Sequence, residues 1–501
     1  MASQSKKPGA GLARRKVAAK KAAPKTAAKT AGAKKTAKPG EGGRPALQDA
    51  LNPLTSVLKG AWRRREGAGK GRTAASPPPV EAAPHRSPLA PEALPDLHPI
   101  DGVSLATATT GIKYKNRPDL LVARFAPATT VAGVFTQSAT AAAPVDWCRG
   151  HLDRNDGAEA GLLIVNAGNA NAFTGKAGMA AVKTIAAAGA KAAKCRQKNV
   201  LIASTGVIGE PLPTDPIVKV LPALCDPDRQ AAAPPPPQAW AKAAHAITTT
   251  DTFPKAATAT AQIDGVPVTV NGIAKGSGMI APDMATMLAF IFTDATLPGA
   301  VLQTLLLLGV RDTFNTVTVD GDTSTNDTVL AFATGQRDHA PIKRAGDRRL
   351  ADFRTKWHSV LHDLALQIVR DGEGATKLIR VMVSGAETTR AATLIARSIA
   401  HSPLVKTAIA GEDANWGRIV MAVGKAGAAI DPTAMTIRIG GLPVASGGAR
   451  DPAYDEAALA RHMKEQTIDL AVDVGLGTGT ATVWTCDLTH GYIAINADYR
   501  S

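Results

Sequence analysis

One glycine-rich stretch near the middle of the chain constrains the fold most, and it reads KGSGMIAPDMATML from Lys275 to Leu288. Its glycines at 276 and 278 permit backbone conformations that a side chain would forbid. Pro282 fixes its own φ and favours an extended conformation at the residue before it. Because an apolar run from Met287 to Phe292 follows directly, the stretch predicts a tight turn that leads into a buried element.

Thr286 lies at the end of this turn, and a threonine hydroxyl is a nucleophile only when a base lies beside it. No histidine is near in sequence. A cut between Ala285 and Thr286 would supply the base, because the freed α-amino group can accept the hydroxyl proton. Two alternatives remain open from the residues alone. Thr286 caps a turn that enters a buried strand or helix, or the loop cradles a phosphate, although Lys275 precedes the glycines instead of following them as in a P-loop.

The net charge of +16 is confined to the N-terminal segment. Residues 1–88 contain 20 lysines and arginines against 4 acidic residues, and the rest of the chain carries equal numbers of both. These Lys/Ala/Pro-rich repeats have too little apolar content to fold, so we expect a disordered basic tail and linker over residues 1–92. Dispersed lysines favour weak, sequence-independent contact with nucleic acid. A tail with no role and a mitochondrial transit peptide are the alternatives.

The composition of the remainder is that of a globular protein. Hydrophobic residues make up 45% of the chain, which supports a large buried core. The four cysteines are widely scattered and form no C-x-x-C pair, so reduced thiols are expected instead of disulfides or a zinc site. No apolar run approaches the ~20 residues that span a bilayer. We expect a cytoplasmic protein without a metal or a membrane contact, and the mitochondrial matrix is the alternative compartment.

Hydrophobic patterning predicts a mixed α/β body that begins near Ala93. The segment Asn166–Asn171 is expected to be a turn whose amides could bind a ligand. The segment Asp320–Asp327 is rich in oxygen ligands but lacks the spacing of an EF-hand, so a calcium site is not expected there. Strands are predicted over 120–125, 131–135, 161–165, 200–203, 377–383 and 436–439, and helices over 180–193, 301–308 and 351–370.

Several separated motifs resemble those of the ornithine acetyltransferase family, also called the glutamate N-acetyltransferases. The resemblance covers about residues 93–501 and none of the basic tail. Its motifs are Ala132–Thr136, Ala142–Val145, Asn166–Gly175, Ser204–Gly209, Thr249–Lys255, Lys275–Leu288, Val319–Thr328, Asp371–Lys377, Gly411–Arg418 and Asn496–Ser501.

The resemblance implies that the chain cuts itself between Ala285 and Thr286. An α chain over 93–285 and a β chain over 286–501 would then share the mixed α/β, aminopeptidase-like fold of the family. It implies Thr286 as the nucleophile, with Thr205 and Gly206 as the oxyanion hole. The implied substrate contacts are Thr249, Lys275, Thr286, Glu373, Asn496 and Ser501. Thr252 is the alternative to Thr249 among them.

The implied reaction transfers an acetyl group from N2-acetyl-L-ornithine to L-glutamate in arginine biosynthesis, through an acetyl-Thr286 ester and without a metal or cofactor. The charges suit amino-acid substrates, because Lys275 can pair with a carboxylate and Glu373 with an ammonium group. Acetyl-CoA, which some family members use, is a candidate co-substrate, and an α2β2 heterotetramer is the implied assembly. A related hydrolase with water as acceptor and a nucleic-acid-binding protein acting through the tail remain as alternatives.

Overall fold

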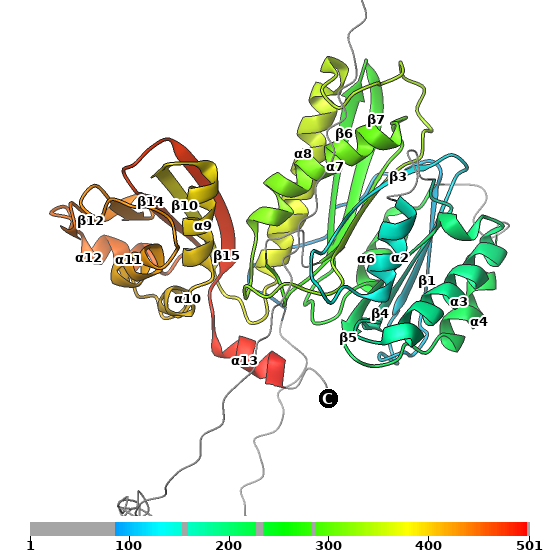
Figure 1. Ribbon diagram of the computed structural model, residues 1–501, viewed down its shortest axis with the longest axis horizontal. Helices are drawn as coiled ribbons and strands as arrows, with labels where there is room; N and C mark the ends of the chain where they lie inside the picture. Colours follow the sequence, from blue (N-terminus) through cyan, green and yellow to red (C-terminus); the bar gives the residue numbers. More distant parts are fainter. Residues whose placement is uncertain (1–85, 153–158, 227–233, 282–286, 498–501) are drawn as a thin grey trace, which may run out of the picture. The chain divides into compact units, whose positions relative to one another are not determined.

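The computed structural model describes residues 86–152, 159–226, 234–281 and 287–497, and Figure 1 shows their helices and strands. The chain divides between residues 81 and 82, and the predicted basic tail lies almost entirely outside the described residues. The folded body includes residues 86–92, which the sequence analysis assigned to the linker. Ser87 is buried there, and its hydroxyl donates a hydrogen bond of 2.6 Å to the carbonyl of Arg370.

A four-stranded sheet contains the strand that carries the predicted oxyanion segment. Its strand order is β1-β2-β4-β5. The pairs β1–β2 and β2–β4 are antiparallel, whereas β4–β5 is parallel. The four strands are β1 (Val103–Ala108), β2 (Leu120–Phe125), β4 (Leu162–Asn169) and β5 (Val200–Val207).

A five-stranded sheet carries the glycine-rich stretch at one end of its strands. Its strand order is β3-β9-β8-β7-β6, so the two strands that follow residue 286 lie between strands that precede it. The pair β8–β9 is parallel, and the other neighbours are antiparallel. The strands are β3 (Thr130–Phe135), β6 (Lys255–Ile263), β7 (Val266–Lys275), β8 (Leu288–Thr293) and β9 (Thr328–Ala333).

Strand β8 shows why these two sheets form adjacent layers. All six of its residues are buried, which is typical of a strand covered on both faces. Phe290 and Phe292 pack in a core shared with residues of β2 and β4, whereas Ala289 and Ile291 pack in a core shared with two helices. Successive side chains alternate between faces, so β8 contacts the four-stranded sheet on one side and helices on the other.

Helices complete the outer layers of this part of the body. Figure 1 shows α7 (Gly299–Asp312) and α8 (Ala351–Arg370) beside the five-stranded sheet, and their apolar residues belong to its second core. The four-stranded sheet is covered by other helices, whose apolar faces join the first core. These are α2 (Ala143–Leu152), α3 (Gly175–Ala193), α4 (Asp215–Leu224) and α6 (Pro237–Ala246).

The C-terminal part forms a six-stranded sheet with its own apolar core, in the order β13-β12-β11-β14-β10-β15. Its strands are β10 (Leu378–Ala386), β11 (Thr436–Ile439), β12 (Leu442–Ser446), β13 (Ala449–Arg450), β14 (Thr467–Asp473) and β15 (Gly479–Cys486). Its helices are α9 (Thr389–Ala400), α10 (Pro403–Ala410), α11 (Trp416–Gly424) and α12 (Glu456–His462), and the last described element is α13 (His490–Ala497). The predicted mixed α/β class is confirmed.

The Asn-rich segment after residue 165 differs from its prediction as a turn. Strand β4 continues to Asn169, paired in parallel with β5. The Asn166 side chain donates to the carbonyl of Asn169 at 2.8 Å, and the Asn171 side chain donates to the carbonyl of Gly178 at 3.1 Å. The Asn166 amide therefore holds the end of β4, and the Asn171 amide holds the start of α3.

Candidate active site

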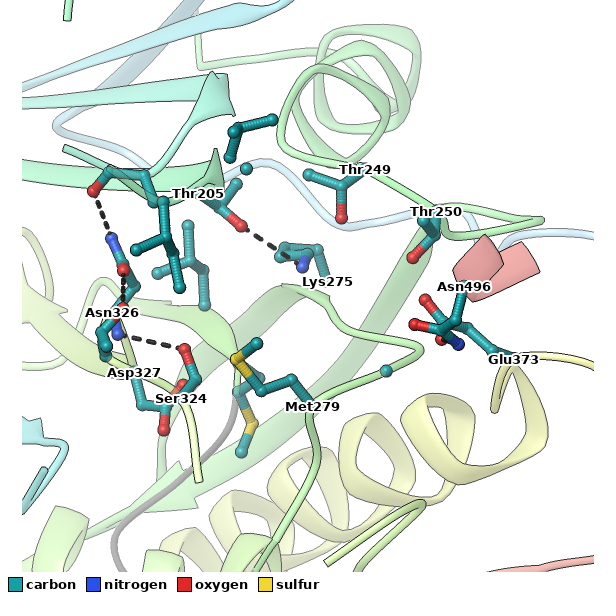
Figure 2. Close-up of a pocket in the computed structure, with 18 residues that line it drawn as sticks. Thr205, Thr249, Thr250, Lys275, Met279, Ser324, Asn326, Asp327, Glu373 and Asn496 are labelled. Atoms are coloured by element: carbon teal, nitrogen blue, oxygen red, sulfur yellow. Dashed lines mark hydrogen bonds between the residues drawn. The ribbon is translucent and has the colours of Figure 1, made fainter. Parts of the chain in front are cut away.

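One pocket of about 270 Å³ collects the predicted site residues that the structure describes. Figure 2 shows Glu373 and Asn496 beside Thr250 on one side, Asn326 and Asp327 on the other, and Lys275 between them. Ala285, Thr286 and Ser501 lie outside the described residues, so their positions stay predictions. The predicted residues that line the pocket are Thr205, Gly206, Thr249, Lys275, Glu373 and Asn496.

Gly206 of strand β5 is paired with Gly168 of β4, and the space between the two strands there requires a glycine. Its φ is +133°, a conformation that side-chain-bearing residues rarely adopt. A Cβ at this position would lie 2.2 Å from the carbonyl carbon of Gly168. The pairing of the two strands thus fixes the backbone of Gly206 at the pocket wall.

Thr205 presents its hydroxyl to the pocket beside Lys275. The Lys275 ammonium donates to the Thr205 Oγ1 across 3.4 Å. Because Lys275 is only a donor, the hydroxyl acts as the acceptor in this contact and its own proton can point elsewhere. Thr205 can therefore donate a hydrogen bond to an oxygen in the pocket, as the oxyanion role requires.

Lys275 ends strand β7 and is only 8% exposed. Burial lowers the pKa of its ammonium group, and the nearby Asp251 carboxylate partly opposes that effect. No ion pair joins Lys275 to any described residue within 4.0 Å. In the described part of the chain, this buried cation has no direct carboxylate partner.

A buried ion-pair triad supports this wall of the pocket. Lys255 contacts the carboxylates of Asp251 and Asp371, each at 2.6 Å, and all three side chains are fully buried. Burial alone would raise the pKa of Asp251, but the Lys255 and Lys275 cations outweigh it, and the pKa is lowered. Asp251 also accepts the backbone N–H groups of Gly276 at 2.7 Å and Thr249 at 2.9 Å. The triad therefore positions both pocket segments.

Thr249 and Thr252 lie in different surroundings in the structure, and their roles as substrate contacts stay predictions. The Thr252 backbone N–H and hydroxyl both donate to Asp371, so this residue faces the triad. Thr249 and Thr250 line the pocket. Thr250 was not among the predicted site residues, because a run of three consecutive threonines gives no signal that selects one of them.

Glu373 lies on the side of the pocket opposite Asn326 and Asp327, and it is 7% exposed. Burial raises the pKa of its carboxyl group, while hydrogen bonds from Asn496 and Thr250 oppose the rise. The Asn496 side-chain amide donates to Glu373 Oε2 at 2.6 Å. This contact fixes the carboxylate against α13 and directs it toward the cavity.

Gly278 is packed directly against the Glu373 carboxyl group, so replacing it with alanine tests that position. The new Cβ would lie 2.4 Å from both the carboxyl carbon and Oε2, and Glu373 would have to leave its contact with Asn496. We expect the KM for an amine-bearing substrate to rise by about tenfold, or roughly 1.4 kcal/mol of binding, in steady-state assays. Gly424→Ala, which meets no atom within 4 Å, is the matched control, and equal KM values in the two variants would contradict the expectation.

The oxygen-rich segment before β9 has a structural use that sequence analysis missed. The Asp320 carboxylate accepts the backbone N–H groups of Met279 at 2.7 Å and Ile280 at 2.9 Å, and thereby fixes the glycine-rich turn. The Asn326 side chain donates to the carbonyls of Ala170 at 2.6 Å and Ser204 at 2.8 Å. Among the described residues, no cluster of three or more His, Cys, Asp or Glu side chains could hold a metal ion.

Two further expectations concern the state of the cysteines and the absence of a membrane-spanning segment. All four cysteines are free thiols, and burial raises the pKa of the Cys148 thiol to about 12. Within the described ranges, no helix is long and apolar enough to cross a membrane.

A hydroxyl and a backbone segment suited to an oxyanion, beside a buried cation and a buried carboxyl group, define an enzyme of the acyl-transfer class. The chain belongs to the ArgJ family, whose model matches residues 104–501. An arginine biosynthesis bifunctional protein ArgJ of Nitrobacter winogradskyi is 57% identical over 83% of this chain and 99% of its own length. Family membership confirms the predicted enzyme class, an acyltransferase of arginine biosynthesis.

Two solved structures are also similar to the chain. An ArgJ protein of Bacillus halodurans is 40% identical, with 42% of this chain and 99% of that chain covered, at a TM-score of 0.41. An ornithine acetyltransferase of Mycobacterium tuberculosis in complex with ornithine is 32% identical, with 37% and 93% covered, at a TM-score of 0.29.

Proposed function

We propose that this enzyme transfers the acetyl group of N2-acetyl-L-ornithine to L-glutamate through an acetyl ester on Thr286. The chain first cuts itself between Ala285 and Thr286, which frees the α-amino group of Thr286. That amine accepts the hydroxyl proton as the Thr286 oxygen attacks the acetyl carbonyl. The protonated amine then returns the proton to the departing ornithine nitrogen. Glutamate attacks the ester in the second half-reaction and leaves as N-acetylglutamate.

The observation that carries this proposal is the opposite charge of two buried groups on one small cavity. Lys275 and Glu373 are each less than 10% exposed, and both line the pocket. Burying unpaired charges is unfavourable unless a partner neutralises them. An amino acid supplies a carboxylate for Lys275 and an ammonium group for Glu373, so both substrates of the reaction can satisfy the same two groups in turn.

The oxyanion hole assigns roles to Thr205 and Gly206. Acyl transfer places negative charge on the acetyl oxygen in the transition state, and fixed donors stabilise it more than the ground state. The Thr205 hydroxyl and the Gly206 amide would each donate to that oxygen. Loss of one such donor typically raises the barrier by about 2.7–4 kcal/mol. Substrate contacts at Thr249, Asn496 and Ser501, as well as Thr286, complete the proposed site.

The assembly and compartment also belong to the proposal. We infer an α2β2 heterotetramer of two α chains (93–285) and two β chains (286–501), with weak nucleic-acid contact by the basic tail as an accessory property. The relatives described above come from bacteria, which lack a mitochondrial matrix, so a cytoplasmic location is the one proposed.

A transfer assay with isotope-labelled N2-acetyl-L-ornithine tests the proposed reaction. With glutamate present, the label should appear in N-acetylglutamate, and without glutamate the release of acetate should be at least about tenfold slower. Equal rates of acetate release with and without glutamate would assign the enzyme to the hydrolase alternative. Intact mass and N-terminal sequencing of the same sample should show a second polypeptide that begins at Thr286.

The shifted pKa values of Glu373 and Lys275 predict a narrowed pH range for substrate binding. Glu373 binds an ammonium group only when ionised, and its raised pKa means that binding weakens as the pH falls through a value above the ordinary 4.5. Lys275 binds a carboxylate only when charged. Its lowered pKa means that binding weakens as the pH rises through a value below the ordinary 10.5. KM measured against pH should rise on both sides, and Glu373→Gln should remove the acidic limb. An unchanged acidic limb in that variant would contradict the assignment.

Removal of the basic tail should leave the enzyme active if the cut respects the boundary after residue 81. We expect deletion of residues 1–81 to change neither the transfer rate nor the melting temperature. Deletion of residues 1–88 also removes Ser87, whose backbone N–H donates to Thr252 Oγ1 at 2.9 Å. Loss of its two partly buried hydrogen bonds should destabilise the protein by about 1–3 kcal/mol in chemical denaturation. If the shorter deletion abolished activity, the nucleic-acid-binding alternative would gain support.

A further inference from the structure

Met279 brings a large apolar side chain to the pocket and leaves much of it uncovered. It lines the cavity and is 42% exposed. Figure 2 shows Met279 below Lys275, between Ser324 on one side and Glu373 on the other. Removal of apolar surface from water is favourable, so a molecule bound in the pocket would gain affinity by covering this side chain.

The backbone of Met279 is held in a conformation that its side chain disfavours. Its φ is +55°, in the left-handed region where a residue other than glycine is strained. The Asp320 carboxylate holds it there by accepting the N–H groups of Met279 and Ile280, and the Tyr492 hydroxyl donates to the same carboxylate at 3.3 Å. A glycine would form this turn without strain, so the turn alone does not account for a methionine. Strained residues cluster at functional sites, which points to a use for the side chain.

The residue before Met279 places it next to the carboxyl group of the pocket. Gly278 packs so closely on Glu373 that a Cβ on the glycine would lie 2.4 Å from the carboxyl carbon. Met279 follows directly, with its Cα about 3.8 Å further along the chain. A substrate that pairs with both Lys275 and Glu373 extends its carbon chain between these two groups, and Met279 adjoins the end at Glu373.

Ile208 is the other described pocket residue with a large, exposed apolar side chain, at 38%. It lies two residues after Gly206, so it belongs to the segment that is proposed to surround the acetyl oxygen. Met279 is therefore the exposed apolar side chain at the ammonium end of the substrate.

We propose that Met279 determines the specificity of the enzyme for the methylene chain of its amino-acid substrate. The thioether packs on the carbons that precede the ammonium group bound by Glu373. Methionine suits two substrates that bind in turn, because its three rotatable bonds let it adapt to the three methylenes of ornithine and the two of glutamate. The inference rests on the proposed function, which supplies the class of substrate.

Competition by two uncharged side chains separates the methylene contact from the ion pair with Glu373. N2-acetyl-L-norvaline carries the three side-chain carbons of ornithine without its ammonium group, and N2-acetyl-L-alanine carries only one carbon. Each compound is added to the assay with labelled N2-acetyl-L-ornithine, and its inhibition constant is measured. Burial of two methylenes corresponds to about a tenfold difference in affinity. We therefore expect the norvaline compound to inhibit the wild-type enzyme at about tenfold lower concentration than the alanine compound.

Met279→Gly tests the side chain apart from the turn, because glycine adopts a φ of +55° without strain. We expect the ratio of the two inhibition constants to fall below about threefold in this variant. The KM for N2-acetyl-L-ornithine should rise about tenfold while kcat changes less than about threefold, since a contact made equally in the bound state and the transition state affects KM. Met279→Ala should lose the ratio to the same extent. A role in forming the turn alone would leave the ratio and KM unchanged in Met279→Gly.

The matched control is Met421→Ala, which removes a thioether of similar exposure, 39%, from α11 and should leave the ratio and KM unchanged. Melting temperatures verify that the variants are folded. An unchanged ratio in both Met279 variants would overturn the inference, and so would a wild-type enzyme that binds the two compounds equally. In either case, acetyl transfer by the wild type would leave the proposed function standing. A wild-type enzyme that transfers no acetyl group from N2-acetyl-L-ornithine would overturn both.

Discussion

Replacement of Thr286 with alanine is expected to leave one uncut polypeptide with no measurable acetyl transfer. The variant loses the hydroxyl that would attack both the peptide bond before it and the acetyl carbonyl of the substrate. It also keeps residue 286 in peptide linkage, so no free amine is available as a base. Intact mass spectrometry measures the cut, and the labelled-acetyl assay measures transfer. Both effects follow from the loss of the hydroxyl oxygen.

Thr286→Ser provides the control for this expectation, because it retains the hydroxyl and removes only a methyl group. We expect the serine variant to be cut and to retain transfer within about one or two orders of magnitude of the wild type. Substantial transfer by the alanine variant would mean that the nucleophile is another residue, and the proposed mechanism would fail.

Replacement of Lys255 with methionine is expected to destabilise the fold by about 3–5 kcal/mol, because the variant leaves two buried carboxylates without their shared cation. The Asp251 and Asp371 side chains are fully buried on either side of Lys255. Their repulsion would also loosen the backbone N–H groups of Thr249 and Gly276 that Asp251 holds. Chemical denaturation monitored by circular dichroism measures the free energy of unfolding.

Lys183→Met, on the exposed face of α3, is the control for this variant and should change stability by less than about 0.5 kcal/mol. A loss below about 1 kcal/mol in Lys255→Met would mean that the carboxylates are protonated or solvated in the native protein. The expected loss should be smallest at acidic pH, where protonation removes the repulsion between the two carboxyl groups.

The elements with one clear apolar period were predictable from the sequence. Strand β2 and helix α8 have the predicted bounds. Helix α3 ends where predicted but begins at Gly175, five residues earlier than predicted. The end of β4 was not predictable, since Asn166 to Asn169 have low strand propensity. Parallel pairing with β5 extends the strand there, and such tertiary pairing overrides local preference.

The site was predictable in its residues but not in its supporting network. The resemblance to a known family identified six described residues that line one pocket. It assigned no role to Thr250 or Asp327, and it did not show that Asp251, Lys255 and Asp371 form one buried cluster. The contact between Lys255 and Asp371 joins residues 116 apart in sequence, and it forms because helix α8, which ends just before Asp371, packs on strand β6.

The strand order of the five-stranded sheet changes the molecularity of folding once the chain is cut. Strands β8 and β9, which follow residue 286, lie between β3 and β7, which precede it, with six residue pairs at each junction. The uncut precursor assembles this sheet in a first-order process. The two cut polypeptides would have to find each other, so refolding after denaturation would depend on concentration and on the success of a bimolecular encounter. The mature enzyme would thus retain a structure that its separate chains cannot readily rebuild.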